Sequence, residues 1–200
     1  MPYDLTVPGW MSETNLQAIE QLAARVPTGG NIVEIGSFCG RSARAWALSA
    51  PRAALYCIDT WNLNFENLGR AWLDGMPGDH SRYRGTAEKT FHETMKDLGN
   101  VTALKGLSTD PWPVPLADIV FLDGDHSRKG VLRELELWEG RLTPNGLLCG
   151  DDFRTEDPWI GVIKAVTDFA RGRGYDIFVP AFTTLWILFA SESHRHTWWP

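Results

Sequence analysis

The chain has 200 residues, a formal net charge of −6, and 44% apolar and 22% charged residues. This composition is ordinary for one globular domain with a sizeable core, and the acidic balance argues against a nucleic-acid-binding surface, which needs clustered lysine and arginine. The N-terminus lacks a basic segment followed by an apolar one, and no apolar run reaches the ~18 residues of a membrane span, so we expect a cytoplasmic protein without nucleic-acid or membrane partners.

The first part of the chain predicts a helix followed by a strand–helix–strand unit. Ser12 is a suitable N-cap for a helix over 12–26, where apolar residues recur at helical spacing. A strand over 32–35, a helix over 41–49 and a strand over 54–58 follow. Two strands joined by a helix in close succession imply parallel pairing with a right-handed crossover.

Two segments do not follow this alternation. Residues 61–85 are polar and interrupted by glycine and proline, but their aromatic residues favour a folded lid or substrate segment. The tail 191–200 is predicted to be either loose or docked through Trp198 and Trp199.

The remaining chain predicts further helices and strands. The helices are expected over 86–98, 129–142 and 159–170, and the strands over 101–104, 119–122, 147–149, 177–179 and 184–190. A short turn separates the last two strands, which are expected to form an antiparallel hairpin. The pattern predicts an α/β fold in a single domain over 1–200: a Rossmann-like doubly wound sheet, mostly parallel, with helices on both faces.

Small or polar residues stand at or near the carboxyl ends of the predicted parallel strands. They are Gly36, Asp59, Ser108, Asp123 and Asp151. Open α/β sheets bind ligands outside the carboxyl ends of their strands, so we expect these positions to share one site. One such residue alone could simply end a strand, but the recurrence of the pattern favours a ligand site.

The loop from Gly36 to Gly40 has the glycine spacing of a tight ligand-binding turn. Phe38 stands where a dinucleotide-binding loop has its middle glycine, and no Gly-Lys-Ser/Thr follows, so a pyrophosphate cradle is disfavoured. Glu34 would repel phosphate and could instead help to hold a cationic ligand. Asp59 could accept hydrogen bonds from both ribose hydroxyls, or could serve only as a turn or cap residue.

Three aspartates, Asp123, Asp151 and Asp152, follow the ends of two predicted neighbouring strands. Unpaired carboxylates brought together would repel one another, and a divalent cation would remove that cost; oxygen ligands suit Mg²⁺ best. The alternative is helix capping by Asp125 or Asp152. His126 could act as a general base, or could be a loop histidine that only packs or caps.

Four segments form an ordered set of motifs: EIGSFCGRSA from Glu34, VTALKGLSTD from Val101, VFLDGDH from Val120 and GLLCGDDF from Gly146. This set resembles the motifs of the metal-dependent catechol-type O-methyltransferases. GWMS from Gly9 and IDTW from Ile58 make the chain more specifically similar to a bacterial group of small class I methyltransferases. The resemblance covers most of the chain, over 9–153.

The resemblance implies a methyltransferase that uses S-adenosylmethionine and Mg²⁺ or another divalent cation. Asp123, Asp151 and Asp152 would bind the metal. His126 stands where the family has its basic lysine, a departure that leaves the histidine as the candidate base. The predicted catalytic residues are therefore His126 and Asp123.

The same resemblance assigns a cofactor pocket. Gly36 and Ser42 would hold the methionine end of the cofactor, and Asp59 would bind its ribose. Ser108 and Thr109 would border the adenine. The complete predicted cofactor-binding set is Glu34, Gly36, Ser37, Phe38, Gly40, Ser42, Asp59, Thr60, Trp61, Ser108, Thr109 and Asp123.

Other functions remain open at this point. The chain could be a metal-dependent hydroxylase-like tailoring enzyme on the same fold, although it has no flavin or iron motif. It could also bind S-adenosylmethionine without catalysis, whereas Phe38 disfavours a nicotinamide dehydrogenase. For the methyltransferase we expect a small-molecule hydroxyl acceptor of open identity, and a homodimer is the default assembly.

Overall fold

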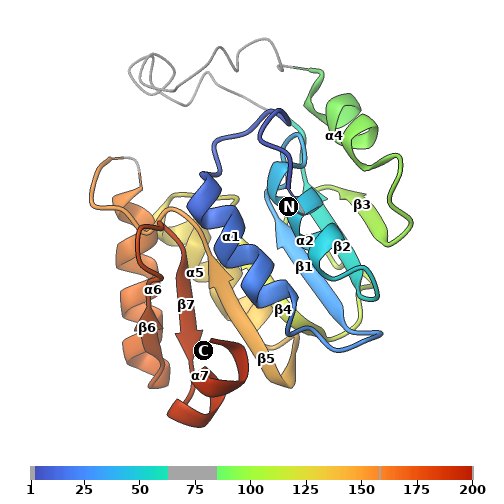
Figure 1. The fold of residues 1–200 in the computed structure, drawn as a ribbon. Helices are drawn as coiled ribbons and strands as arrows, with labels where there is room; N and C mark the ends of the chain where they lie inside the picture. Colours follow the sequence, from blue (N-terminus) through green and yellow to red (C-terminus); the bar gives the residue numbers. More distant parts are fainter. Residues whose placement is uncertain (1–2, 63–84, 158, 200) are drawn as a thin grey trace.

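The computed structural model describes residues 3–62, 85–157 and 159–199, which form a seven-stranded sheet covered by helices (Figure 1). The strand order is β3-β2-β1-β4-β5-β7-β6. The strands are β1 (Asn31–Ile35), β2 (Ala54–Asp59), β3 (Val101–Lys105), β4 (Ala117–Leu122), β5 (Leu142–Gly150), β6 (Asp176–Phe178) and β7 (Trp186–Phe189).

Strands β1 to β5 pair in parallel, whereas β7 is antiparallel to both β5 and β6. The predicted mostly parallel sheet with a C-terminal antiparallel hairpin is confirmed. The central strand β1 is almost continuously buried, as expected for a parallel strand covered on both faces. Because β1 lies between β2 and β4, the order of the strands reverses beside it, and ligands bind at such a switch point.

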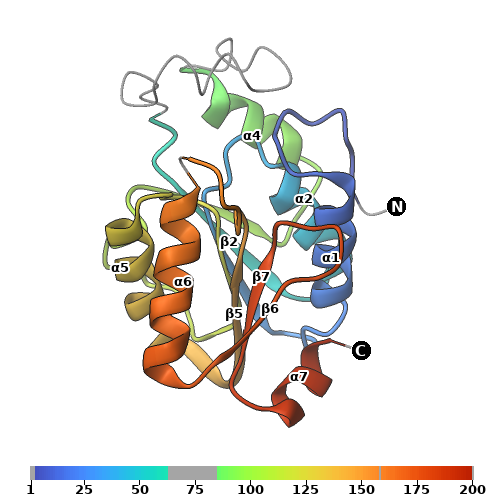
Figure 2. The same cartoon turned by 90° about the vertical axis from the view of Figure 1, so that its left-hand side faces the viewer.

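Helices cover both faces of the sheet, as predicted (Figure 2). They are α1 (Glu13–Ala23), α2 (Arg41–Ser49), α4 (Ala87–Met95), α5 (Arg128–Glu139), α6 (Ile160–Arg173) and α7 (Glu192–Trp198). Helices α1, α2, α4 and α7 bury side chains against one face, and α5 and α6 against the other. None of the described helices has the length and apolar character needed to cross a membrane.

Each face of the sheet has its own apolar core. On the face covered by α1 and α2, Trp46 of α2 packs edge-on against Phe121 of β4, with ring centroids 5.5 Å apart. On the other face, Trp138 of α5 and Phe169 of α6 are buried against the sheet. Burying a side chain of this size contributes about 2–3 kcal/mol. The two cores make the sheet a rigid support for the loops at its carboxyl edge.

Strand β5 begins earlier than the predicted strand over 147–149. Residues 144–146, Pro-Asn-Gly, lie between the predicted helix over 129–142 and that predicted strand, and they are typical of a turn. In the structure Leu142 pairs with Ala117, and the ladder is irregular before regular pairing with β4 resumes. The bulge accommodates the turn-forming residues inside a longer strand.

The C-terminal tail forms helix α7 and is docked rather than loose. The Ser191 side chain caps the helix by accepting a hydrogen bond from the His194 N–H. Trp198 is buried, and its indole N–H donates to the Asn145 carbonyl at 2.8 Å. Trp199 is partly buried against the same core. Of the two alternatives that the sequence left open, the docked one is correct.

Most of the predicted lid over 61–85 lies outside the described residues. Its first residue, Trp61, is buried against Phe91 of α4, with ring centroids 5.1 Å apart. Helix α4 lies within the predicted range of 86–98. The lid role stays a prediction.

Candidate functional site

The carboxyl ends of the central strands are in register. Ile35 at the end of β1 pairs with Ile58 of β2 on one side and with Leu122 of β4 on the other. Leu122 also pairs with Gly150 at the end of β5. The loops that follow these strands therefore leave the sheet at the same edge, as the sequence predicted.

Gly36 allows the loop after β1 to approach the loop after β4 closely. Its φ of +89° is one that L side chains rarely adopt, and a Cβ there would lie 2.1 Å from the Asp123 carbonyl oxygen. Gly40, with φ of +94°, ends the loop as the N-cap of α2. Only glycine fits at position 36, because backbone atoms fill the space of a side chain.

Two polar side chains, Glu34 just before this loop and Ser37 within it, have no hydrogen-bond partner among the described residues. Neither carboxylate oxygen of the fully buried Glu34 is hydrogen-bonded, and the Ser37 hydroxyl is likewise unpartnered. Burial raises the pKa of Glu34 to about 7, although the nearby hydroxyls of Ser37 and Ser42 act in the opposite direction. A buried carboxylate without a partner costs stability and favours a cationic ligand nearby.

The buried Glu34 predicts a dependence of stability on pH. Its folded pKa of about 7 lies above the ordinary value of 4.5, so its stabilising contribution is complete below pH 4.5 and is lost as pH rises through 7. The loss amounts to about 3 kcal/mol at most. We expect Glu34→Gln to exceed the wild type in free energy of unfolding by at least ~1 kcal/mol at pH 8, measured by urea denaturation.

The control for this prediction is Glu136→Gln, which changes an exposed carboxylate on α5. We expect this variant to keep the wild-type slope of stability against pH. If Glu34→Gln keeps the same slope between pH 4.5 and 8, then Glu34 does not titrate in that range in the folded protein.

Asp59 at the end of β2 is tied to the loop after β1. Its Oδ2 accepts a hydrogen bond from the Phe38 N–H at 2.8 Å, and its Oδ1 accepts from the Trp61 N–H at 2.6 Å. The Trp61 indole N–H donates to the Phe38 carbonyl at 2.7 Å. Burial raises the pKa of Asp59, and the backbone N–H groups oppose that rise. Each carboxylate oxygen keeps a lone pair for a ligand hydroxyl.

Ser108 is paired with an acidic residue that the sequence analysis missed. Its hydroxyl donates to Oε1 of Glu134 on α5 at 2.6 Å. Glu134 is buried, its Oε2 has no hydrogen-bond partner among the described residues, and burial raises its pKa to about 7. The available signal was its place on the apolar face of the helix, three residues after Val131 and beside Leu135.

Three further residues of the predicted cofactor-binding set are Ser42, Thr60 and Thr109. Ser42 is buried in α2. Thr60 and Thr109, which follow the ends of β2 and β3, are partly exposed. The Thr60 hydroxyl accepts a hydrogen bond from the Asn62 N–H at 3.2 Å.

Asp123, His126 and Asp152 form a group of side chains that could hold a metal ion. One ligand atom from each lies within 4.8 Å of the other two. His126 Nε2 is 2.9 Å from Asp152 Oδ2. Burial raises the pKa of Asp123 well above its ordinary value, and the charges of Asp151 and Asp152 raise it further. A bound cation would relieve this repulsion.

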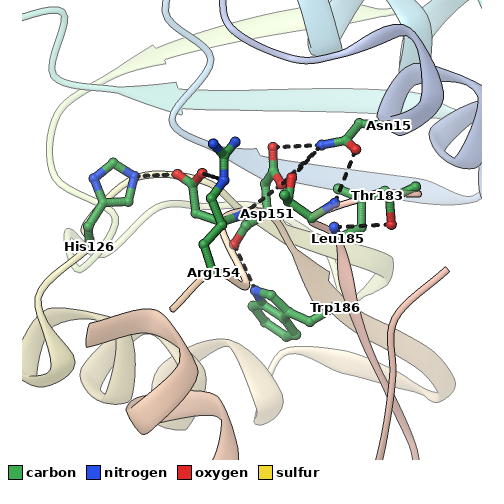
Figure 3. A network of polar contacts seen from close by, with 9 residues as sticks. Asn15, His126, Asp151, Arg154, Thr183, Leu185 and Trp186 are labelled. Atoms are coloured by element: carbon green, nitrogen blue, oxygen red, sulfur yellow. Dashed lines mark hydrogen bonds and ion pairs between the residues drawn. The ribbon is translucent and has the colours of Figure 1, made fainter. Parts of the chain in front are cut away.

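Asp151 lies outside that group, and its carboxylate is directed toward Asn15 of α1 (Figure 3). Both of its oxygens accept hydrogen bonds from Asn15 Nδ2 at 3.1 Å, and Oδ1 also accepts from the Thr184 hydroxyl. Its backbone carbonyl accepts from the Trp186 indole N–H at 3.0 Å. Burial raises the pKa of Asp151 to about 6. The predicted ligand role of Asp151 stays a prediction.

Arg154 is a second residue that the sequence analysis missed. Its Nε lies 3.2 Å from Asp152 Oδ1, and its guanidinium lies over the Trp159 ring at 5.0 Å from the centroid. Its charge opposes the rise in the pKa of Asp123. Asn15 was missed as well, because a single polar residue on the apolar face of a helix does not by itself indicate a site.

Comparison with solved structures shows what the fold is similar to. An O-methyltransferase from Bacillus cereus in complex with SAH is 16% identical, with a TM-score of 0.60, and the match covers 91% of this chain and 84% of that chain. The SAH-bound methyltransferase PaMTH1 of Podospora anserina is 18% identical, with coverages of 88% and 77% and a TM-score of 0.60. A precorrin-6y C5,15-methyltransferase from Geobacter metallireducens is 11% identical, with coverages of 93% and 90% and a TM-score of 0.61.

Comparison by sequence identifies the family. No curated protein matches the chain. A family model described as a methyltransferase domain matches residues 33–153, which include the loop at Gly36 and the acidic residues Asp123 and Asp152. Because this match spans more than half of the 200 residues, the chain belongs to that methyltransferase-domain family.

Proposed function

We propose that this methyltransferase transfers the methyl group of S-adenosylmethionine to a hydroxyl of a small molecule and binds Mg²⁺ or another divalent cation. The proposal depends above all on the group of Asp123, His126 and Asp152 at the sheet edge. Carboxylate oxygens favour hard divalent cations, and an imidazole beside them can accept a proton. An O-methyltransferase with a similar fold supports the choice of an oxygen acceptor.

The unpartnered polar atoms of Glu34 and Ser37, at the loop that starts with Gly36, fit the methionine end of the cofactor. The buried carboxylate of Glu34 provides negative potential for a sulfonium and an ammonium group, and the Ser37 hydroxyl is available to a ligand. Asp59 keeps lone pairs for the ribose hydroxyls, and Ser108 would lie beside the adenine.

The residues of the acidic group fit a divalent cation and a base. Asp123 and Asp152 would supply carboxylate ligands, and a bound cation lowers the pKa of a coordinated hydroxyl. His126 would accept the hydroxyl proton. The Asp152 carboxylate, 2.9 Å from Nε2, would stabilise the charged imidazole that results.

The proposed reaction is a direct displacement. The acceptor oxygen would form a bond to the methyl carbon as the carbon–sulfur bond broke, the bonding electron pair would return to sulfur to give S-adenosylhomocysteine, and His126 would hold the proton lost by the hydroxyl. The protein contributes chiefly by holding the two reactants together at the sheet edge. Such positioning can supply up to about 7–11 kcal/mol of the reduction in barrier.

We expect S-adenosylhomocysteine to stabilise the protein and NAD not to do so. At a ligand concentration of one hundred times Kd, preferential binding adds about 2.7 kcal/mol, which raises Tm by roughly 5–10 °C for a chain of this size. A thermal-shift measurement with both ligands checks this expectation. Calorimetric titration of S-adenosylhomocysteine, with and without Mg²⁺, should show at least ~50-fold weaker binding to Asp59→Ala, because the ribose hydroxyls lose a charged acceptor.

The matched control is Asp97→Ala, which removes a surface carboxylate 2.7 Å from Arg44. This variant should bind S-adenosylhomocysteine like the wild type. Failure of the wild type to bind the compound under any metal condition would contradict the proposed cofactor. Binding of the compound without measurable binding of Mg²⁺ or Mn²⁺ would contradict only the proposed metal.

A further inference from the structure

We infer that Asn15 of α1 is a positioning residue that acts through Asp151 to hold the Asp152 carboxylate beside His126. The inference rests on the proposed function, since Asp152 is one of the proposed ligands. It gives Asp151 a supporting role in place of the predicted role as a ligand.

The side-chain amide of Asn15 is buried and completely hydrogen-bonded. The residue is 2% exposed. Its Nδ2 donates to both Asp151 oxygens at 3.1 Å and to Thr184 Oγ1 at 2.8 Å, and its Oδ1 accepts from the Thr184 N–H at 3.2 Å. Because both donors and the acceptor oxygen are used, the orientation of the amide is determined. A satisfied buried network of this kind is rigid.

The Asp151 carboxylate connects the fixed amide of Asn15 to the backbone of Asp152. Its Oδ1 accepts a hydrogen bond from the Asp152 N–H at 2.7 Å, in addition to the one from Thr184. Asp152 has a φ of +62°, a left-handed conformation that costs most L residues about 1–2 kcal/mol and that aspartate adopts more readily than most. Such a conformation persists where the surrounding structure holds it, and here the Asp151 carboxylate does so.

The left-handed turn determines where the Asp152 carboxylate lies. Its Oδ2 is 2.9 Å from His126 Nε2, and its Oδ1 is 3.2 Å from Arg154 Nε. An extended backbone at this residue would direct the carboxylate elsewhere. The amide of Asn15 therefore contributes to the proposed metal site although it touches neither Asp123 nor His126 in the described contacts.

The contacts of Asp151 favour a supporting role over coordination. Its two oxygens accept hydrogen bonds from Asn15, from Thr184 and from the following backbone N–H. It is absent from the group of ligand atoms that lie within 4.8 Å of one another. Oδ1 already accepts three hydrogen bonds, so coordination of a cation without loss of a contact would be confined to the one remaining lone pair of Oδ2.

The test exchanges the side chains of Asn15 and Asp151. Asn15→Asp places two carboxylates against each other and removes the donor. The double variant Asn15→Asp with Asp151→Asn restores one donor and one acceptor with the direction of the hydrogen bond reversed. If Asp151 only supports Asp152, the exchange restores the site. If Asp151 coordinates the cation, the exchange leaves the affinity lowered, because a neutral amide oxygen replaces a charged ligand at position 151.

The first readout needs no metal and no acceptor. We expect amide hydrogen exchange of the Asp152 N–H, followed by NMR, to become at least ~10-fold faster in Asn15→Asp and to return to within about threefold of wild type in the double variant. The second readout is calorimetric titration of Mn²⁺ in the presence of S-adenosylhomocysteine. Its affinity should fall at least ~10-fold in the single variant and recover in the double variant.

Two controls separate this effect from a general loss of structure. Affinity for S-adenosylhomocysteine should stay within about twofold of wild type in both variants, since Asn15 does not reach the loop at Gly36 in the described contacts. Thr14→Val removes the neighbouring hydrogen bond from α1 to the Phe182 carbonyl, 2.9 Å long, and should change neither readout.

Three results have separate meanings. Unchanged exchange of the Asp152 N–H in a folded Asn15→Asp variant would overturn the positioning role. Restored exchange without restored Mn²⁺ affinity in the double variant would show that Asp151 is a ligand and would overturn its supporting role. A wild type that binds S-adenosylhomocysteine but no Mn²⁺ would contradict the proposed metal, and the exchange measurement alone would then decide the positioning role.

Discussion

Gly36→Ala is expected to lower the free energy of unfolding by about 4 kcal/mol and to abolish binding of S-adenosylhomocysteine. A methyl group at this position would lie 2.1 Å from the Asp123 carbonyl oxygen and 2.5 Å from its carbonyl carbon. Neither atom can move cheaply, because both belong to the backbone at the end of a buried strand. The φ of +89° adds conformational strain to the steric overlap. Urea denaturation and calorimetric titration measure the two effects.

Gly29→Ala separates strain from overlap. Gly29 has a φ of +80°, similar to that of Gly36, but an added Cβ there would meet no atom within 4 Å. We expect this control to lose only about 1 kcal/mol and to bind the cofactor product normally. A Gly36→Ala protein that is no less stable than Gly29→Ala would show that the two loops can separate, and it would remove the basis for a preformed cofactor turn.

Asp123→Asn should have opposite effects on metal binding and on stability. The substitution keeps the shape of the side chain but removes a charged ligand, so the affinity for Mn²⁺ in the presence of S-adenosylhomocysteine should fall at least ~100-fold, or about 2.7 kcal/mol. Burial and the charges of Asp151 and Asp152 raise the pKa of Asp123. A raised folded pKa means that the ionised form destabilises the metal-free protein as pH rises, so the variant should be at least as stable as wild type at pH 8.

The control lies in the same loop. Asp125 is exposed, and its Oδ1 accepts a hydrogen bond from the Ser127 N–H at 2.6 Å. Asp125→Asn should leave the Mn²⁺ affinity within about twofold of wild type, because the residue is not part of the acidic group. Equal Mn²⁺ affinity for wild type and Asp123→Asn would contradict the proposed metal site, whereas equal weakening by both substitutions would indicate a general electrostatic effect.

Features that depend on neighbouring residues could be predicted from the sequence. Ser12 caps α1 by accepting a hydrogen bond from the Asn15 N–H at 3.2 Å, as its position before the apolar periodicity indicated. Gly36, Asp59 at the end of β2 and Asp123 after β4 could be placed at one sheet edge because parallel strands bring their carboxyl ends together. The meeting of the loop at Gly36 and the acidic group at one sheet edge therefore followed from periodicity and spacing, whereas their roles toward a cofactor and a metal are implied by the resemblance to methyltransferases.

Features that depend on packing between distant segments could not be predicted. Asn15 and Asp151 are 136 residues apart and meet only because α1 packs beside the end of β5. Glu134 and Ser108 are 26 residues apart and meet through the packing of α5. Asn15 and Glu134 are each a single polar residue on an apolar helical face, and a local sequence pattern does not indicate which distant residue will be the hydrogen-bond partner. The extension of β5 was missed for a related reason, since pairing with β4 keeps a turn-forming segment within a bulged strand.

The amino-acid sequence by itself determined the helices and strands, their parallel alternation and the sheet edge at which the candidate site lies, because these depend on local periodicity and on the direction of the strands. Only the tertiary structure decided which carboxylates face His126 and which face α1. That choice depends on the left-handed backbone at Asp152 and on the buried hydrogen bonds of Asn15, both of which exist only after the helix and the sheet have packed.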